Sequence, residues 1–245
     1  MMKSYRNQIY LVIALLVLLS LFVGCVAIQP QRLGAASFNL TSVTESGSTA
    51  INDTLLRQSL AQIATGPISS AEADALLFMR EEEKLAHDVY VTLGTMWSLP
   101  IFNNISQSEA THTSAIKMLL DRYQLSDPAA TTSVGEFVNP TLQELYNQLV
   151  EQGSQSLADA LRVGATIEDL DIVDLQTRNA QTERADIQLV YQNLMRGSRN
   201  HLRSFVSTLG RQTGESYQPQ YLDQATFDSI LSTAVERGQG RGRGR

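Results

Sequence analysis

The chain has 245 residues, of which 43% are hydrophobic and 18% are charged, so it can bury one core or at most two. Its formal net charge is −6 although both ends carry surplus positive residues, and such an acidic body argues against nucleic-acid binding. The single cysteine, Cys25, excludes internal disulfides, cysteine-rich zinc sites and iron–sulfur clusters. Any bound metal must therefore take oxygen and imidazole ligands.

Residues 1–28 have the pattern of an export signal or a membrane anchor. Lys3 and Arg6 precede an apolar run from Ile9 to Val23. The run can continue to Ile28 and span a bilayer as an uncleaved helix. Alternatively, FVGC at residues 22–25 resembles the lipobox of bacterial lipoproteins, with phenylalanine in place of the usual leucine, which implies lipidation of Cys25. Both alternatives predict an extracytoplasmic domain tethered to the membrane, whereas a cleaved signal would discard Cys25.

Composition divides the remainder of the chain into three parts. Residues 29–68 are rich in Ser, Thr, Ala, Gly and Asn, with one short helical pattern at Thr54–Ile63, and we expect a flexible spacer there. The folded domain is predicted at residues 69–235, where Ser69 and Glu72 form a capping box at its start. The Arg/Gly-rich residues 236–245 are predicted to be a disordered, solvated tail, or one that binds anionic lipid or polymer.

The predicted domain carries the apolar periodicity of helices almost throughout, and no alternating strand pattern of useful length is present. Four long helices are expected at Ser70–Met96, Asn103–Gln124, Ser156–Thr177 and Arg184–Leu209. Shorter helices fit Thr141–Glu151 and Leu222–Thr233. The sequence therefore predicts an all-α fold, a four-helix bundle with short extra helices.

Each long helix has one apolar stripe, and polar residues interrupt every stripe near its middle. The interruptions are Glu83 in the first helix, Glu109 and His112 in the second, Glu168 and Asp171 in the third, and Ser198 and His201 in the fourth. Burying unpaired carboxylates costs several kcal/mol, and the stripes contain no lysine or arginine to pair with them. A divalent cation neutralises carboxylates and also accepts imidazole nitrogen. We therefore predict a metal inside the bundle.

Each of these assignments has a simpler alternative. Glu83 lies in the acidic run 81–83, and such runs are usually solvated. Glu168 and Asp171 could flank a second apolar stripe made by residues 163, 167, 170 and 173. His201 could be a core histidine bonded to a backbone carbonyl. Tyr90 could pack in the core, or donate a hydrogen bond to a ligand carboxylate.

Two short motifs resemble those of rubrerythrin-type ferritin-like proteins. EKLAHDVY, beginning at Glu83, is similar to their first-helix motif, and SEATH, ending at His112, is similar to their second-helix ExxH. The longer strings EEEKLAHDVY, GATIEDLDIVDL and VYQNLMRGSRNHLRSF resemble an uncharacterised bacterial and archaeal family of ferritin-like domains, over residues 71–231. The resemblance implies a ferritin-like bundle with a di-iron or related carboxylate site. Its implied ligands are Glu83, Glu109, His112, Glu168 and His201.

The fourth helix departs from the superfamily pattern in one respect. Ser198 stands where a second ExxH motif would supply a glutamate, so a bridging carboxylate is missing unless Asp171 replaces it. One hypothesis is a redox protein that cycles one or two iron ions with oxygen or peroxide, as an oxidase, peroxidase or iron-handling protein. The other is a non-catalytic module with a structural or mononuclear metal that binds a cell-envelope partner. The metal is expected to be iron or another divalent metal such as manganese or zinc. Homo-oligomers are compatible with both.

Overall fold

The structure is a computed structural model that describes residues 40–44 and 47–237. The predicted signal or anchor at residues 1–28, including Cys25, lies outside the described residues, as does most of the predicted tail. Within the part of the chain that is described, no helix has the length and hydrophobicity needed to cross a membrane.

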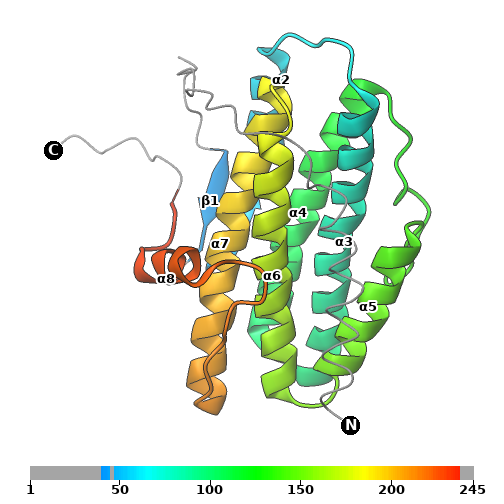
Figure 1. Ribbon diagram of the computed structural model, residues 1–245. Coiled ribbons are helices and arrows are strands. Elements are labelled where there is room, and N and C mark those ends of the chain that lie inside the picture. The colour runs from blue at the N-terminus through cyan, green and yellow to red at the C-terminus, as the bar shows by residue number, and fades with distance from the viewer. Residues whose placement is uncertain (1–39, 45–46, 238–245) are drawn as a thin grey trace, which may run out of the picture. The chain divides into compact units, whose positions relative to one another are not determined.

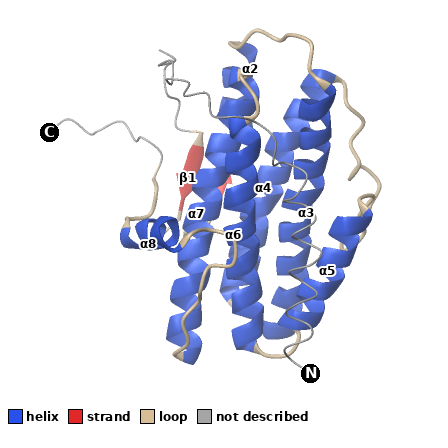
Figure 2. Cartoon of the chain, in the orientation of Figure 1, coloured by secondary structure: helices blue, strands red, loops and turns tan. Residues whose placement is uncertain are grey.

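Four long helices lie side by side and form the body of the domain (Figure 1). They are α3 (Ser70–Trp97), α4 (Pro100–Tyr123), α6 (Leu157–Ala180) and α7 (Ala185–Thr213). Helix α3 packs mainly on α4, and α6 packs mainly on α7. The shorter α5 (Pro140–Gly153) lies against α3 and α6, and α8 (Gln224–Ser232) contacts α7 (Figure 2). The sequence predicted an all-α fold, and the described residues are mostly helical, with two short strands in addition. The four long helices are confirmed, and their ends lie within four residues of the predicted ones.

Local sequence signals determine where several helices begin. Ser69 accepts a hydrogen bond from the Glu72 backbone N–H, while the Glu72 carboxylate accepts one from Ser69, which is the predicted capping box. Asn139 caps α5 immediately before Pro140, where the missing N–H of proline has no cost. Ser156 caps α6 by accepting from the backbone N–H of Asp159.

The expected flexible spacer at residues 29–68 is corrected by the structure for its described part. Strands β1 (Thr41–Val43) and β2 (Thr49–Ile51) form an antiparallel hairpin, and α2 (Asp53–Ala61) follows it. The hairpin is bonded to α4, because Ser108 Oγ accepts from the Thr49 N–H and Thr111 Oγ1 accepts from the Ile51 N–H. Strands of three residues are too short to show a period-two pattern, which is why sequence periodicity missed them.

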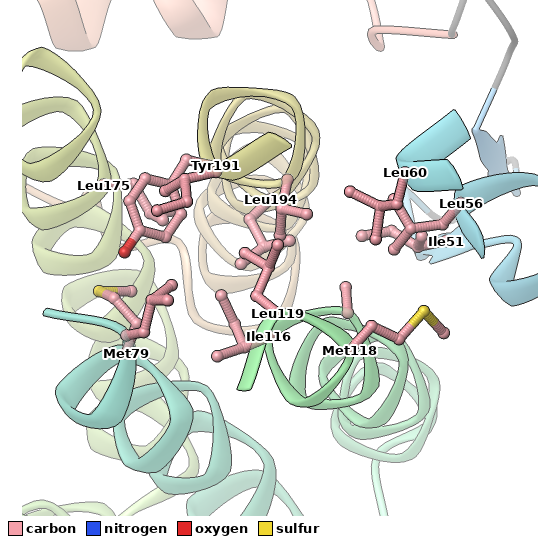
Figure 3. Packing of buried hydrophobic residues seen from close by; sticks show 14 of the residues in the cluster. Ile51, Leu56, Leu60, Met79, Ile116, Met118, Leu119, Leu175, Tyr191 and Leu194 are labelled. Carbon is pink, nitrogen blue, oxygen red and sulfur yellow. The ribbon is translucent and has the colours of Figure 1, made fainter. Parts of the chain in front are cut away.

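The hydrophobic core extends from the bundle to this N-terminal layer (Figure 3). Ile51, Leu56 and Leu60 are buried in the same cluster as Ile116 and Leu194 of the long helices. Residues of this layer therefore contribute buried apolar surface, at about 25 cal/mol per Å², to the stability of the domain.

Helix α6 is covered over much of its surface, because α3, α5 and α7 all pack against it. Both stripes predicted for this helix are consequently inside the protein. Val163 and Leu170 of the apolar stripe are buried, and so are Glu168 and Asp171 of the polar one. The sequence had suggested either that Glu168 and Asp171 face inward or that the apolar stripe beside them does. Both are buried, so the two readings do not exclude each other.

Candidate metal centre

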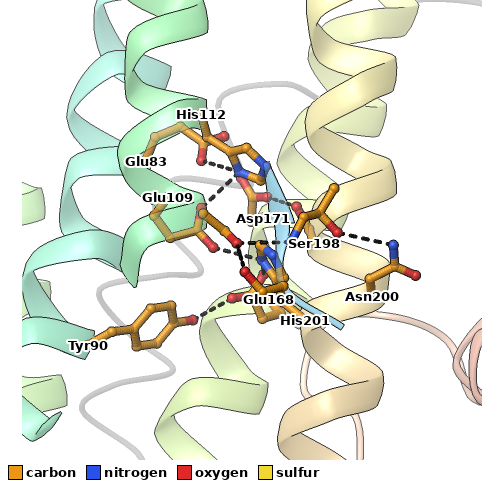
Figure 4. A network of polar contacts seen from close by, with 12 residues as sticks. Glu83, Tyr90, Glu109, His112, Glu168, Asp171, Ser198, Asn200 and His201 are labelled. Atoms are coloured by element: carbon orange, nitrogen blue, oxygen red, sulfur yellow. Dashed lines mark hydrogen bonds and ion pairs between the residues drawn. The ribbon is translucent and has the colours of Figure 1, made fainter. Parts of the chain in front are cut away.

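Six ionisable side chains from four helices meet in the middle of the bundle (Figure 4). Helix α3 contributes Glu83, α4 contributes Glu109 and His112, α6 contributes Glu168 and Asp171, and α7 contributes His201. None of the six is more than 6% exposed. The structure thus brings together all of the residues that the sequence singled out as metal ligands.

Glu109 occupies the middle of the cluster, and its two carboxylate oxygens face different histidines. Its Oε2 lies 2.8 Å from Nδ1 of His112, and its Oε1 lies 2.8 Å from Nδ1 of His201. The two imidazole rings are stacked, with centroids 5.5 Å apart. Both histidines therefore direct the same ring nitrogen toward one shared carboxylate.

Each histidine is also approached by a second glutamate. Nδ1 of His112 is 3.2 Å from Oε2 of Glu83, and Nδ1 of His201 is 3.5 Å from Oε2 of Glu168. Two groups result, Glu83–Glu109–His112 and Glu109–Glu168–His201, in each of which one ligand atom per residue lies within 4.8 Å of the others. Each group could hold a metal ion, with two carboxylates and one imidazole as ligands.

Hydrogen bonds from neighbouring side chains hold two of the acids in place. The Tyr90 hydroxyl donates to Oε1 of Glu168 over 2.6 Å, which leaves Oε2 facing His201. The Ser198 hydroxyl donates to Oδ2 of Asp171, while Oδ1 of Asp171 has no hydrogen-bond partner among the described residues. Ser198 stands where a glutamate was expected. Instead of supplying a carboxylate itself, it orients Asp171 of the neighbouring helix α6.

The acidic run Glu81-Glu82-Glu83 is buried at all three positions, contrary to what is usual for such runs. Its members point in different directions around α3. The Glu81 carboxylate accepts hydrogen bonds from the backbone N–H groups of Val138 and Asn139, just before α5. Glu82 faces α6, and Glu83 faces the metal centre. Each acid therefore has its own surroundings, which a count of charges along the sequence cannot reveal.

The charges of the cluster strongly perturb its titration. Burial raises the pKa of Glu83 to about 7, and burial together with the charge of Glu83 raises the pKa of Asp171 well above its ordinary value. Burial also opposes ionisation of Glu109, but His112 and His201 outweigh it and lower the pKa of Glu109 well below its usual range. Without a metal, the cluster must hold several protons to remain buried.

Both histidines favour the protonated form in this environment. Burial acts to lower the pKa of His201, but the carboxylates of Glu109 and Glu168 raise it to about 9. Glu109 and Glu83 have the same effect on His112, whose pKa lies well above its ordinary value. A divalent cation would replace these protons, so metal binding is expected to release protons at neutral pH.

Gly197 leaves the space that the ring of His112 occupies, a role that the stripe pattern did not predict. A Cβ atom at position 197 would lie 2.5 Å from both Cε1 and Nε2 of His112. We expect Gly197→Ala to displace this ring, to cost about 1–3 kcal/mol of stability by overpacking, and to abolish metal binding in the group containing His112. Metal analysis and thermal unfolding of the purified variant measure both effects.

Gly210→Ala is the matched control on the same helix, because the nearest atom to a Cβ there lies 3.7 Å away. It should bind metal like the unmodified chain. Full metal binding by Gly197→Ala would contradict the assigned position of the His112 ring.

The region that forms this cluster also matches known sequences. A family model described as an uncharacterised protein domain (DUF2202) matches residues 72–234. Uncharacterized protein MJ0754 of Methanocaldococcus jannaschii is 52% identical over 175 residues, which are 71% of this chain and 94% of that protein. The crystal structure of hypothetical protein MJ0754 from Methanococcus jannaschii matches with a TM-score of 0.69 and 50% identity, covering 71% of this chain and 99% of that one. None of these names states a function.

Proposed function

We propose that this chain, which belongs to the DUF2202 family of uncharacterised domains, is a metal-binding helical protein with a two-ion carboxylate–histidine centre. Iron is the metal we infer, and oxidation of iron by oxygen or peroxide is the activity. Further support is the likeness of the two motifs at Glu83 and Glu109 to those of rubrerythrin-type ferritin-like proteins.

The position of Glu109 is the observation that carries the proposal. One carboxylate lies between two histidines, and the ring nitrogen that each histidine directs toward it is also approached by a further glutamate. A carboxylate whose two oxygens face two separate ligand groups is suited to bridge two cations a few ångströms apart. Oxygen and imidazole donors fit iron, manganese and zinc, and the described site contains no thiolate to favour softer metals.

The chain's own residues would have distinct roles in this centre. Glu83 and His112 would hold one ion, Glu168 and His201 would hold the other, and Glu109 would be shared by both. When bound, iron supplies the electrons that reduce the oxidant. The phenol of Tyr90 keeps Glu168 oriented, and Ser198 holds Asp171, which is placed to accept or return a proton beside the centre.

A structural or mononuclear metal site in a non-catalytic module is the second candidate function. The near-complete burial of the site favours it, because His112 and His201 are fully buried and Glu83 is 1% exposed. A structural ion needs no access for a substrate, whereas an oxidase site does. In this alternative the surface of the domain would bind a partner in the cell envelope. Tethering through residues 1–28, like the extracytoplasmic location, stays a prediction from the sequence.

Metal content and reactivity test the proposal directly. The full chain is purified, loaded anaerobically with ferrous iron, analysed for metal per chain, and then mixed with oxygen or with peroxide. We expect two irons per chain and oxidation much faster than that of free ferrous iron in the same buffer. One tightly held ion that raises the melting temperature without reacting would instead support the structural role.

A further inference from the structure

We propose that a pocket lined by Arg178 and Tyr191 at one end of the bundle binds a small oxyanion of the size of formate or bicarbonate. The pocket lies where α3 and α7 begin and α6 ends. None of the residues that line it belongs to the two ligand groups of the metal centre. The inference therefore goes beyond the proposed metal-binding function and does not depend on it.

The pocket is small and has one exposed wall. Its volume is about 50 Å³, which is room for about two water molecules or one ion of three or four heavy atoms. Ser69 and Gln181 on its wall are exposed, whereas Ile187 and Tyr191 are buried. A small solute can therefore reach the buried side of the pocket from the surface.

The hydroxyl of Tyr191 is a buried group without a partner. The residue is 1% exposed, and its hydroxyl forms no hydrogen bond within the described part of the chain. Figure 3 shows its ring beside Leu175, with the hydroxyl directed away from Leu194. Buried tyrosine hydroxyls usually have a hydrogen-bond partner. Tyr191 thus has an O–H to donate to an occupant of the pocket.

Arg178 supplies a second unsatisfied donor to the same pocket. Its Nε atom is buried and has no hydrogen-bond partner among the described residues. Its guanidinium lies 4.4 Å from the centre of the Phe78 ring, and its position in the last turn of α6 suits the negative end of that helix. These contacts explain where the side chain lies, but they leave the Nε–H without an acceptor.

The charges at the pocket favour an anion. Glu72 is the one acidic residue that lines it, and this carboxylate accepts hydrogen bonds from the hydroxyls of Ser69 and Thr182. Glu72 also pairs with Arg184 over 3.4 Å, so its charge is balanced from outside the pocket. Arg178 has no such ion pair with any described carboxylate. Water could accept from both free donors, but only an oxyanion also balances the guanidinium charge.

The test measures thermal unfolding of the full chain in sodium formate and in sodium chloride at equal ionic strength. We expect a Kd for formate of about 1 mM, which is near the limit for an ion of so few atoms. Formate at about 100 mM should then raise the melting temperature by about 5 °C relative to chloride. Nuclear magnetic resonance of ¹³C-labelled formate detects the bound ion directly.

Two variants remove the two free donors one at a time. Arg178→Gln should abolish the effect of formate, because the charge is lost with the Nε–H. Tyr191→Phe keeps the ring and should weaken formate binding about tenfold, the usual effect of removing a hydrogen bond to a charged group. Arg57→Gln is the matched control, since Arg57 is an exposed arginine of α2 that does not line the pocket. It should respond to formate like the unmodified chain.

The absence of a formate effect in the unmodified chain would overturn the site and leave ordered water as the occupant. An effect that persists in both Arg178→Gln and Tyr191→Phe would also overturn it, by placing the formate elsewhere. Stabilisation of the same size by phosphate would contradict the assigned size of the ligand. Metal content should be equal in all these variants, so a failure of the metal-binding function would be seen separately.

Discussion

Glu109→Gln is expected to bind no metal at either position, whereas Glu83→Gln and Glu168→Gln should each retain one ion per chain. The reason is geometric, because Glu109 is the one residue shared by the two ligand groups. The amide of glutamine keeps the shape of the side chain but removes the negative charge and one acceptor oxygen. The measurement is metal per chain after equilibration with excess ferrous iron and removal of the unbound fraction.

Glu83→Gln and Glu168→Gln, which each alter only one of the two ligand groups, serve as internal controls for this result. Each removes one negative charge from the same buried cluster, as Glu109→Gln does. A loss of both ions in Glu83→Gln would show that the two positions fill as one unit. Two ions retained by Glu109→Gln would rule out the bridging role. Far-ultraviolet circular dichroism of each variant shows whether the helices remain folded.

The stabilisation that a bound metal gives should increase as the pH rises from about 6 to about 9. In the metal-free protein the pKa of Glu83 is raised to about 7 and that of His201 to about 9, so the folded state binds more protons than the unfolded state across this range. Stability conferred by these protons is present at the lower pH and is lost as the pH rises through the folded-state values. Metal binding becomes stronger as the pH rises, because protons compete with the metal for the same ligand atoms.

We therefore expect the melting temperature of the metal-free chain to fall by about 5 °C or more as the pH rises from about 6 to about 9. The melting temperature of the loaded chain should change much less. His201→Gln should flatten the dependence of the metal-free chain, while His87→Gln, which alters the histidine outside the centre, should leave it intact. A metal-free melting temperature that rises with pH would contradict the assigned surroundings of His201.

Helix positions were readable from the sequence because they depend on local signals. The capping box at Ser69 and the Asn139-Pro140 pair fix helix starts through contacts within a few residues. The interruptions at Glu109 and His112 were visible for a similar reason, since residues three apart share a helix face whatever surrounds the helix. Burial of that face follows from its apolar neighbours Ile105 and Ile116.

Other features depend on neighbours far away in the sequence. Glu81 is buried beneath the connection before α5, where a backbone N–H group donates to its carboxylate. The fit of Gly197 against His112 joins residues of two different helices. The hairpin at residues 41–51 is held by bonds to α4 rather than by any strong propensity of its own.

The sequence by itself determined the helices, the polar interruptions of their inner faces, and hence the residues available to a metal, because helical periodicity and capping are local properties of the chain. Only the tertiary structure decided that Glu109 stands between two histidines and that Ser198 supports Asp171. Those pairings depend on how the helices are rotated and displaced against one another, which is set by side-chain packing across the whole core.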